Sequence, residues 1–419
     1  MENKLKILAA IILLLGLYSC EDYVSNIAPY NNLLLSDYLN APANVPLFVT
    51  GVENQVAYTV DDLFVAADLL SDQLLFDTRN SLATYPGFQA IDEGNPVDDR
   101  TENTQGFNNA HQLRITADTL IYRINNQVPN LDPTVKANAL HTCYLYSAYA
   151  YYLLASYFGK SQTEGGSPVN LSNFIPSATL YQTAINRWQQ SLTYTTDAYK
   201  KKLVNSFLAK VYLLLGNYTQ AATFASQGLV SADLPLLAKY NAENGNQYRN
   251  QAGESRTSLS VDNRFSAYVT ANSTEKTVRI KLQQLSGIGG FIFWRQLKYV
   301  LTGTTITPIE LMTWQEMNLI RAELAIRGAS ADNALTLINA VRASRQVSLL
   351  PAGTTITLSD PTTATSYSIY EERDKELFLT GNRLLDQRRL NKFNHLPAGS
   401  WQYLPIPRDE KDRNPNWNK

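Results

Sequence analysis

The sequence predicts an all-α fold in which paired helices carry an irregular, loop-rich face. Apolar residues recur at three- and four-residue intervals over several long stretches, which is the spacing of one helix face. One pair of these stretches carries a recognisable repeat motif. Two long segments between helices are loop-like: the first is rich in Asp, Asn, Gly and Pro, and the second contains several glycines, which favour turns and loops. We therefore expect helical hairpins interrupted by long insertions.

Four stretches with helical spacing precede the middle of the chain. They are Phe107–Asn126, a segment from Pro133 to Phe158, Ala178–Leu192 and Leu203–Leu215. The second contains Cys143, which we expect to be a small buried hydrophobe because its neighbours are apolar.

The repeat motif begins where the fourth helix ends. Leu215-Gly-Asn-Tyr218 is followed by Ala221 and Ala225, and glycine with small residues at this spacing lets two helices cross closely, as in tetratricopeptide repeats. A looser copy spans Glu316–Arg342, with Gly328 in a turn that we expect to be one residue longer. The intervals between pairs are uneven, so we do not expect a regular solenoid.

The two insertions are Asp77–Asn103 and Asn241–Leu301. The second contains the glycine-rich run Gly287–Gly290, and short alternating pieces such as Thr277–Leu282 favour a strand or a small hairpin.

Charge and cysteine content exclude some classes of protein. The formal net charge is −1, whereas nucleic-acid binders concentrate positive charge, so we expect no nucleic-acid partner. The two cysteines are Cys20 and Cys143. If Cys20 carries a lipid, no intramolecular disulfide can form.

The N-terminus has the pattern of an export signal. Lys4 and Lys6 precede the apolar run Ile7–Leu17, which is too short to cross a bilayer, and Leu17-Tyr-Ser-Cys20 resembles a lipobox. We expect residues 1–19 to be a cleaved lipoprotein signal peptide, Cys20 to be lipidated, and residues 20–419 to form one domain. The alternative is an ordinary secretory signal with an incidental cysteine.

The C-terminal region contains a charged motif and a proline-rich tail. Glu372, Arg373 and Glu376 lie within one helical turn, and Arg383 and Asp386 follow at i, i+3 spacing, so we expect ion pairs along each helix face. Gly381 between the two helices permits a positive φ. Pro405 and Pro407 enforce an extended tail before Asn414-Pro-Asn416. We interpret the charged cluster as a structural network that docks the last helices.

This order of elements resembles the C-terminal signature of the SusD/RagB family, and the resemblance extends over the mature chain. Members are surface nutrient-binding lipoproteins of Bacteroidetes-type bacteria. The resemblance implies a SusD-like fold, an outer-membrane lipid anchor, and a SusC-like TonB-dependent transporter over which the protein acts as a lid. It also implies that the two insertions form the ligand surface. Known members capture oligosaccharides, while RagB-like members capture peptides, so the ligand class stays open.

No catalytic, metal or cofactor site is apparent in the sequence, and we expect the protein not to be an enzyme. The histidines His111, His141 and His395 are scattered, without metal-ligand spacing. Adjacent acidic pairs such as Asp61-Asp62, Asp98-Asp99 and Glu371-Glu372 do not face each other across a cleft, as glycosidase carboxylates do. Solvated helix faces or caps explain them better.

Aromatic and polar residues in the insertions are the candidates for ligand binding. An aromatic ring stacks on the flat C–H face of a sugar, while Asn, Asp, Gln and Arg bond its hydroxyl groups. The predicted ligand-binding residues are Arg79, Asn80, Tyr85 and Phe88 in the first insertion, and Tyr248, Tyr268, Phe291, Trp294 and Arg295 in the second.

Three functional hypotheses follow. The first is a lid that captures a glycan, with a peptide-capturing RagB-like lid as its close variant. The second is a tetratricopeptide scaffold that binds no ligand and lacks an aromatic-lined concavity. The third is a surface hydrolase, which requires two carboxylates facing across a cleft.

Overall fold

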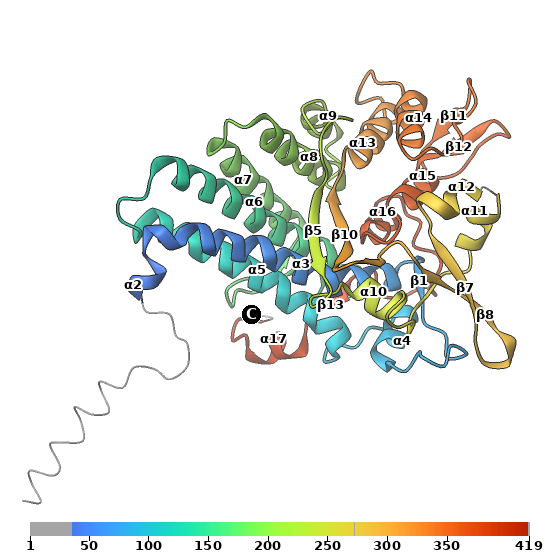
Figure 1. The fold of residues 1–419 in the computed structure, drawn as a ribbon, viewed down its shortest axis with the longest axis horizontal. Helices are drawn as coiled ribbons and strands as arrows, with labels where there is room; N and C mark the ends of the chain where they lie inside the picture. The colour runs from blue at the N-terminus through green and yellow to red at the C-terminus, as the bar shows by residue number, and fades with distance from the viewer. Residues whose placement is uncertain (1–35, 272, 418–419) are drawn as a thin grey trace, which may run out of the picture.

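The computed structural model describes residues 36–271 and 273–417, and it confirms the predicted mostly helical fold. Long helices lie side by side in one part of the molecule, while the insertions gather at the opposite end (Figure 1). One hydrophobic core extends from the first long helix to the C-terminal tail.

The stack begins with α3 (Val45–Leu70), which follows the short α2 (Ser36–Leu39) and η1 (Pro42–Asn44). It packs against α5 (Thr101–Asn126) and α6 (Pro133–Tyr157), which also contact each other. The sequence reasoning did not identify α3, because its apolar residues surround most of the helix and leave no clear stripe.

The next helices are α7 (Ser177–Thr193), α8 (Ala198–Leu214) and α9 (Tyr218–Ala225). Helices α5 to α8 confirm the four predicted helices, although α5 and α8 begin at Thr101 and Ala198 and not at the predicted Phe107 and Leu203. Side-chain oxygens of Asp132 and Asp197 accept hydrogen bonds from the first turns of α6 and α8, which fixes where these helices begin. Gly216 has φ 72° in the α8–α9 turn, as the repeat motif requires.

The looser repeat forms α13 (Trp314–Ile326) and α14 (Ala334–Ser344), and α13 packs on α8 and α9. The prediction of a turn only one residue longer was wrong. Residues 327–333 join α13 to α14, whereas residues 215–217 join α8 to α9. Gly328 has φ 72°, so the two turns start alike and the added residues follow the glycine.

A three-stranded sheet links the two helix pairs. It has the order β5 (Leu236–Asn241), β10 (Thr305–Met312), β9 (Leu301–Thr302), and all its strands pair antiparallel. Two-residue and three-residue strands form smaller pairs elsewhere: β2 (Phe158–Gly159) with β13 (Leu404–Pro405), β3 (Gly166–Ser167) with β4 (Ile175–Pro176), and β11 (Thr355–Thr357) with β12 (Ser366–Ser368).

The second insertion contributes three strands to a four-stranded sheet, whose edge strand β1 lies just before the first insertion. The order is β1 (Leu74–Leu75), β6 (Ser260–Val261), β8 (Ile292–Gln296), β7 (Leu282–Ser286). A small hairpin is therefore present, as β7 and β8, but its position differs from the predicted one. Most of Thr277–Leu282 belongs to helix α12 (Ser273–Val278) and the turn after it, and the glycine run with η2 (Ile288–Gly290) closes the hairpin. Short helices α4 (Pro86–Asp92), α10 (Gln247–Ala252) and α11 (Phe265–Ala271) complete the insertions.

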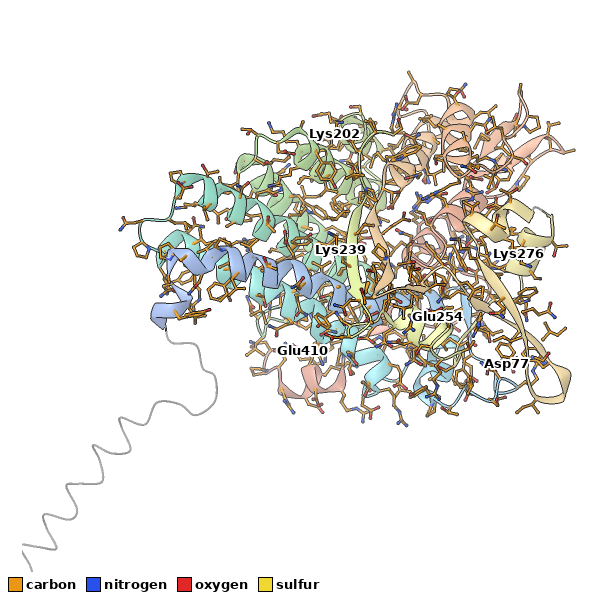
Figure 2. The ribbon with its side chains drawn as sticks, in the orientation of Figure 1. Asp77, Lys202, Lys239, Glu254, Lys276 and Glu410 are labelled. Atoms are coloured by element: carbon orange, nitrogen blue, oxygen red, sulfur yellow. The ribbon has the colours of Figure 1, made fainter. Side chains whose placement is uncertain are left out.

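Side chains hold the two insertions together. Asn80 Nδ2 donates to the carbonyl oxygen of Thr257 over 2.5 Å, and Arg256 Nη2 donates to Thr84 Oγ1 over 2.9 Å. Asp77 of the first insertion and Glu254 of the second lie in the same half of the molecule (Figure 2).

The C-terminal motif forms α15 (Ile369–Glu376) and α16 (Asn382–Arg389), followed by α17 (Arg408–Arg413) after the proline tail. Gly381 separates the first two with φ 74°, as predicted, and an added Cβ there would lie 2.8 Å from Phe64 Cγ. The prediction of ion pairs within each helix was wrong. The charged cluster is nevertheless a structural network, as predicted. Because Arg373 binds Asp386 over 2.7 Å, the pairing joins the two helices to each other.

The other partners come from distant parts of the chain. Glu372 binds Arg279 and Arg342, each over 2.7 Å. Arg383 binds Asp72 over 2.6 Å. These ion pairs join the C-terminal helices to α14, to the second insertion and to the turn between α3 and β1.

Cys143 is fully buried in the core as predicted, and burial raises the pKa of its thiol to about 12. Cys20 and the rest of the predicted signal lie outside the described residues. Within residues 36–271 and 273–417, no helix has the length and apolar character needed to span a membrane.

Candidate functional site

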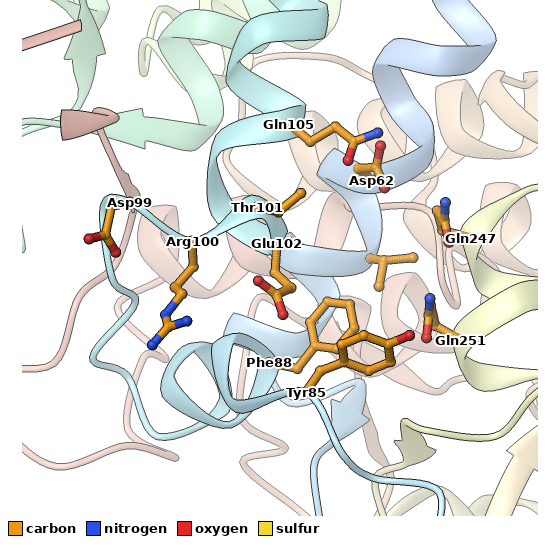
Figure 3. A pocket seen from close by; sticks show the side chains of 11 residues that line it. Asp62, Tyr85, Phe88, Asp99, Arg100, Thr101, Glu102, Gln105, Gln247 and Gln251 are labelled. Carbon is orange, nitrogen blue, oxygen red and sulfur yellow. The ribbon is translucent and has the colours of Figure 1, made fainter. Parts of the chain in front are cut away.

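A pocket of about 490 Å³ opens where the first insertion meets the second (Figure 3). Its walls come from α3, α4, the first turns of α5, and α10. The lining residues are Asp62, Val65, Tyr85, Phe88, Asp99, Arg100, Thr101, Glu102, Gln105, Gln247 and Gln251. The pocket therefore combines two aromatic rings with carboxyl and amide groups.

Tyr85 and Phe88 form the aromatic wall. Their ring centroids lie 5.7 Å apart at an angle of 73°, so the rings meet edge to face. Pro86 at the first position of α4 fixes the start of this short helix and thereby the position of both rings. The Arg256 guanidinium lies 5.0 Å from the Tyr85 ring centroid, and Nη1 donates to the Tyr85 hydroxyl over 3.3 Å.

Several polar side chains in the pocket have no hydrogen-bond or ion-pair partner among the described residues. These are the side chains of Asp62, Glu102, Gln105 and Gln247. Gln105 and Asp62 point toward one another from neighbouring helices, and Gln247 and Gln251 approach from α10 (Figure 3). Because the protein leaves these groups unbonded, their hydrogen-bonding capacity is available to water or to a ligand.

The Glu102 carboxylate lies against α4 because residue 87 is a glycine. A Cβ added at Gly87 would lie 2.8 Å from Glu102 Oε1 and closer still to Oε2. Gly87 thus provides the space in which this carboxylate sits beside the aromatic wall.

Asp62 is the most perturbed ionisable group in the pocket. Burial raises the pKa of its carboxyl to about 6. Burial and the adjacent Asp62 also raise the pKa of Asp61, although its carboxylate accepts a hydrogen bond from the Gln247 backbone. The interpretation of these residues as a solvated face was wrong for Asp61, which is 5% exposed because α10 covers this side of α3.

The other two acidic pairs lie outside the pocket or at its edge. Asp98 and Asp99 both bind Arg408, each over 3.0 Å, and these contacts anchor α17. In α15, Glu371 pairs with Lys375 while Glu372 is buried in the ionic network.

The structure separates the predicted ligand-binding residues into three groups. Only Tyr85 and Phe88 line the pocket. A second group lies on or beside the β7–β8 hairpin. There the Arg79 guanidinium stacks 3.7 Å from the Phe291 ring centroid, Arg295 Nε donates to Gln283 over 2.8 Å, and Trp294 is half-buried.

The third group is engaged in structural contacts. Asn80 is 1% exposed, and Tyr248 is fully buried. The Tyr248 ring stacks on Tyr299 at 4.9 Å, and its hydroxyl donates to Asp68. The structure therefore places both residues out of a ligand's reach. The Tyr268 hydroxyl donates to Asp374 over 3.2 Å at the edge of the ionic network.

The pocket contains polar residues that the sequence reasoning did not select. Asp62, Glu102 and Gln105 lie on long helices, and Gln247 and Gln251 lie on a short helix inside the second insertion. The available signal was the acidic pair Asp61-Asp62 inside the mostly apolar segment 56–70. An unpaired carboxyl in such a segment calls for either a partner or a function.

The three histidines have structural surroundings. Burial lowers the pKa of His111 to about 3, His141 Nδ1 lies 3.1 Å from the Ser191 carbonyl, and His395 Nε2 lies 3.0 Å from the Leu70 carbonyl. In the described part of the chain, no cluster of three or more His, Cys, Asp or Glu residues could hold a metal ion.

Comparison with known proteins identifies the fold. No family model and no curated protein matches the sequence. Among solved structures, a SusD superfamily protein from Bacteroides thetaiotaomicron is similar at a TM-score of 0.69 and 16% identity, covering 90% of this chain and 99% of that one. The chain therefore has the SusD-like fold that its sequence predicted.

Two further structures carry names that mention a ligand. A laminarin-binding SusD-like protein matches at a TM-score of 0.67 and 16% identity, over 90% of this chain and 98% of that one. Surface glycan-binding protein A from Bacteroides thetaiotaomicron, in complex with laminarihexaose, matches at 0.67 and 14% identity over the same shares. These names describe binding of glycans by those proteins.

Proposed function

We propose that this protein is a cell-surface lipoprotein that captures an oligosaccharide in the pocket between its two insertions. The observation that carries the proposal is an aromatic wall beside carboxyl and amide groups that no described residue bonds. Sugars present flat C–H faces to such rings and hydroxyl groups to such polar atoms. The fold it shares with glycan-binding proteins supports the same class of ligand.

In this proposal the Tyr85 ring stacks on one sugar unit. Glu102, Gln105 and Gln247 then bond its hydroxyl groups from α5 and α10. The residues at the β7–β8 hairpin, Phe291 and Trp294, extend the surface for further units of the same chain.

The proposal includes an anchor and a partner. Cys20 carries the lipid that holds the protein on the outer membrane, as the lipobox-like sequence indicates. The partner is a SusC-like TonB-dependent transporter, over which the protein acts as a lid and to which it delivers the captured ligand.

Substitution Cys20→Ala should abolish incorporation of a fatty-acid label, and an unchanged level of label would contradict the anchor.

The test of the pocket is calorimetric titration with neutral oligosaccharides, laminarihexaose among them. Tyr85→Ala should weaken binding about tenfold or more, because the stacking surface is lost. Trp294→Ala should weaken binding by a smaller factor without unfolding the protein. Unchanged affinity in Tyr85→Ala would remove the pocket from the proposal, and unchanged affinity in Trp294→Ala would remove the hairpin.

One observation favours a second candidate, hydrolysis. Asp62 and Glu102 line the same pocket from different helices, and the pKa of Asp62 is raised to about 6, as a general acid requires. Chromatography of a bound oligosaccharide after long incubation decides between the two. Intact oligosaccharide supports binding alone, whereas fragments that disappear with Asp62→Asn would establish an enzyme.

A further inference from the structure

We propose that the pocket selects uncharged or amino-substituted sugar units and rejects acidic ones, and that Asp62 and Glu102 are the residues that determine this selectivity. The inference rests on the proposed function and specifies the chemical class of the ligand. Its evidence is the position and pairing of every charged group around the pocket.

The two inner carboxyl groups have no cation to neutralise them. Asp62 enters the pocket from α3 and Glu102 from the first turn of α5, and neither has an ion-pair partner among the described residues. Their neighbours on the walls, Gln105, Gln247 and Gln251, are uncharged amides.

Two cations lie nearby, Arg256 and Arg100, and neither forms an ion pair with these carboxylates. Arg256 lies behind Tyr85, where its guanidinium donates to Thr84, to Tyr85 and to the Leu82 carbonyl oxygen. Arg100 lines the exposed rim of the pocket and forms no ion pair with a described residue, because the neighbouring Asp99 carboxylate binds Arg408. Solvent screens charges at the rim much more than charges inside the pocket.

The position of Glu102 makes its charge relevant to a stacked sugar. The Glu102 carboxylate lies against Gly87, and Gly87 stands between Tyr85 and Phe88 in the sequence. A sugar unit stacked on Tyr85 therefore lies close to this carboxylate. A neutral sugar donates hydroxyl hydrogen bonds to this carboxylate, and an ammonium group would pair with it. A uronate or sulfate instead places a second negative charge beside this carboxylate, where the neighbouring wall residues Gln105, Gln247 and Gln251 carry no positive charge to offset it.

Repulsion of this kind is large enough to decide selectivity. Two like charges about 6 Å apart repel by about 2–3 kcal/mol at an effective dielectric constant near 20, which is on the order of a hundredfold in affinity. Screening at the pocket mouth reduces the effect, so we expect about tenfold or more.

The experiment titrates the full mature chain with matched pairs of oligosaccharides. Each pair has equal length and linkage and differs only at C6, as hydroxymethyl or carboxylate: glucose with glucuronate, mannose with mannuronate, and galactose with galacturonate oligomers. Chitosan oligomers provide the cationic probe. The neutral member of the pair that binds should bind about tenfold or more tightly than the acidic member.

Variants assign the selectivity to named residues. In the double variant Asp62→Asn with Glu102→Gln, the ratio between neutral and acidic members should approach one. The control Glu243→Gln removes an exposed carboxylate outside the pocket and should leave the ratio unchanged.

Gly87→Ala keeps the charges but displaces the Glu102 carboxylate, so it should weaken binding of the neutral member. Circular dichroism melts verify that each variant is folded.

The outcomes separate the inference from the proposed function. Equal or tighter binding of the acidic member overturns the inference and leaves glycan capture intact. A preference for the neutral member that survives in the double variant overturns the assignment to Asp62 and Glu102. Binding of no member of the panel overturns both the inference and the proposed function.

Discussion

Carboxyl groups occur in two regions of this molecule, the C-terminal ionic network and the interior of the pocket. They form ion pairs in the first region, and in the second they have none among the described residues. In the C-terminal network, Arg279 binds Glu275, Glu372 and Glu376, and it is 4% exposed. In the pocket, Asp62 and Glu102 have no such partner among the described residues. Charged residues whose partners are all within the protein stabilise the fold, whereas those without partners remain available for a ligand.

The pKa values of the two regions differ in the same way. Burial alone would raise the pKa of Asp374, but the guanidinium groups of Arg264 and Arg383 hold it at about 2. Burial raises the pKa of Asp62 to about 6, and no neighbouring cation lowers it again. Pairing therefore determines whether a buried carboxyl stabilises or destabilises the folded state at neutral pH.

The largest expected effect comes from breaking the network. Arg279→Ala leaves the buried carboxylates Glu275 and Glu372 without this cation, and we expect the free energy of unfolding to fall by about 3–5 kcal/mol. Chemical denaturation measures the change. The control is Arg413→Ala, in an ion pair whose side chains are 80% and 81% exposed, where we expect less than about 0.5 kcal/mol. Similar losses in both variants would contradict the comparison.

The pH dependence of stability should have opposite signs in the two regions. The folded-state pKa of Asp374 lies below its unfolded value, so the stability it contributes is present above about pH 4 and is lost as pH falls toward 2. The folded-state pKa of Asp62 lies above its unfolded value, so the stability that its protonated form contributes is lost as pH rises from about 4 through 6.

Substitution Asp62→Asn tests that sign directly. At pH 7 we expect it to raise the free energy of unfolding by about 1–2 kcal/mol, because the charged form of a buried group no longer has to be accommodated. At pH 4 the gain should nearly vanish. Thermal unfolding at both pH values measures it, and a loss of stability at pH 7 would show that Asp62 has a partner in the folded protein.

The smallest effect on stability should come from an unbonded amide in the pocket. Gln105→Ala removes a side chain with no partner among the described residues, so the free energy of unfolding should change by less than about 0.5 kcal/mol. Affinity for a neutral oligosaccharide should fall by about 1 kcal/mol, the contribution of one hydrogen bond. A variant that lost stability but kept its affinity would place Gln105 with the structural residues.

Much of the fold could be predicted because its signals are local. Helical spacing located α5 to α8, and the glycine motif located the α8–α9 turn. The sequence did not reveal α3, since a helix buried on most sides has no polar face. Nor could spacing reveal that Glu372 pairs with Arg279 and Arg342, because residue intervals report only neighbours within one helix.

The site was predictable only in part for the same reason. Tyr85 and Phe88, the two predicted residues that line the pocket, stand out as aromatic residues in a segment of Gly, Pro and Asn. Tyr248 belongs to a similar segment but packs into the core, and composition does not distinguish the two environments. Asp62 and Glu102 enter the pocket from long helices, so only the packing of α3, α4, α5 and α10 brings them together.

The most direct test is a crystal structure of the protein with the oligosaccharide that binds most tightly in the titrations. The proposed function predicts a sugar ring stacked on Tyr85, with its hydroxyl groups within hydrogen-bond distance of Glu102 and Gln247. A sugar bound at the β7–β8 hairpin, with the pocket holding only water, would contradict it.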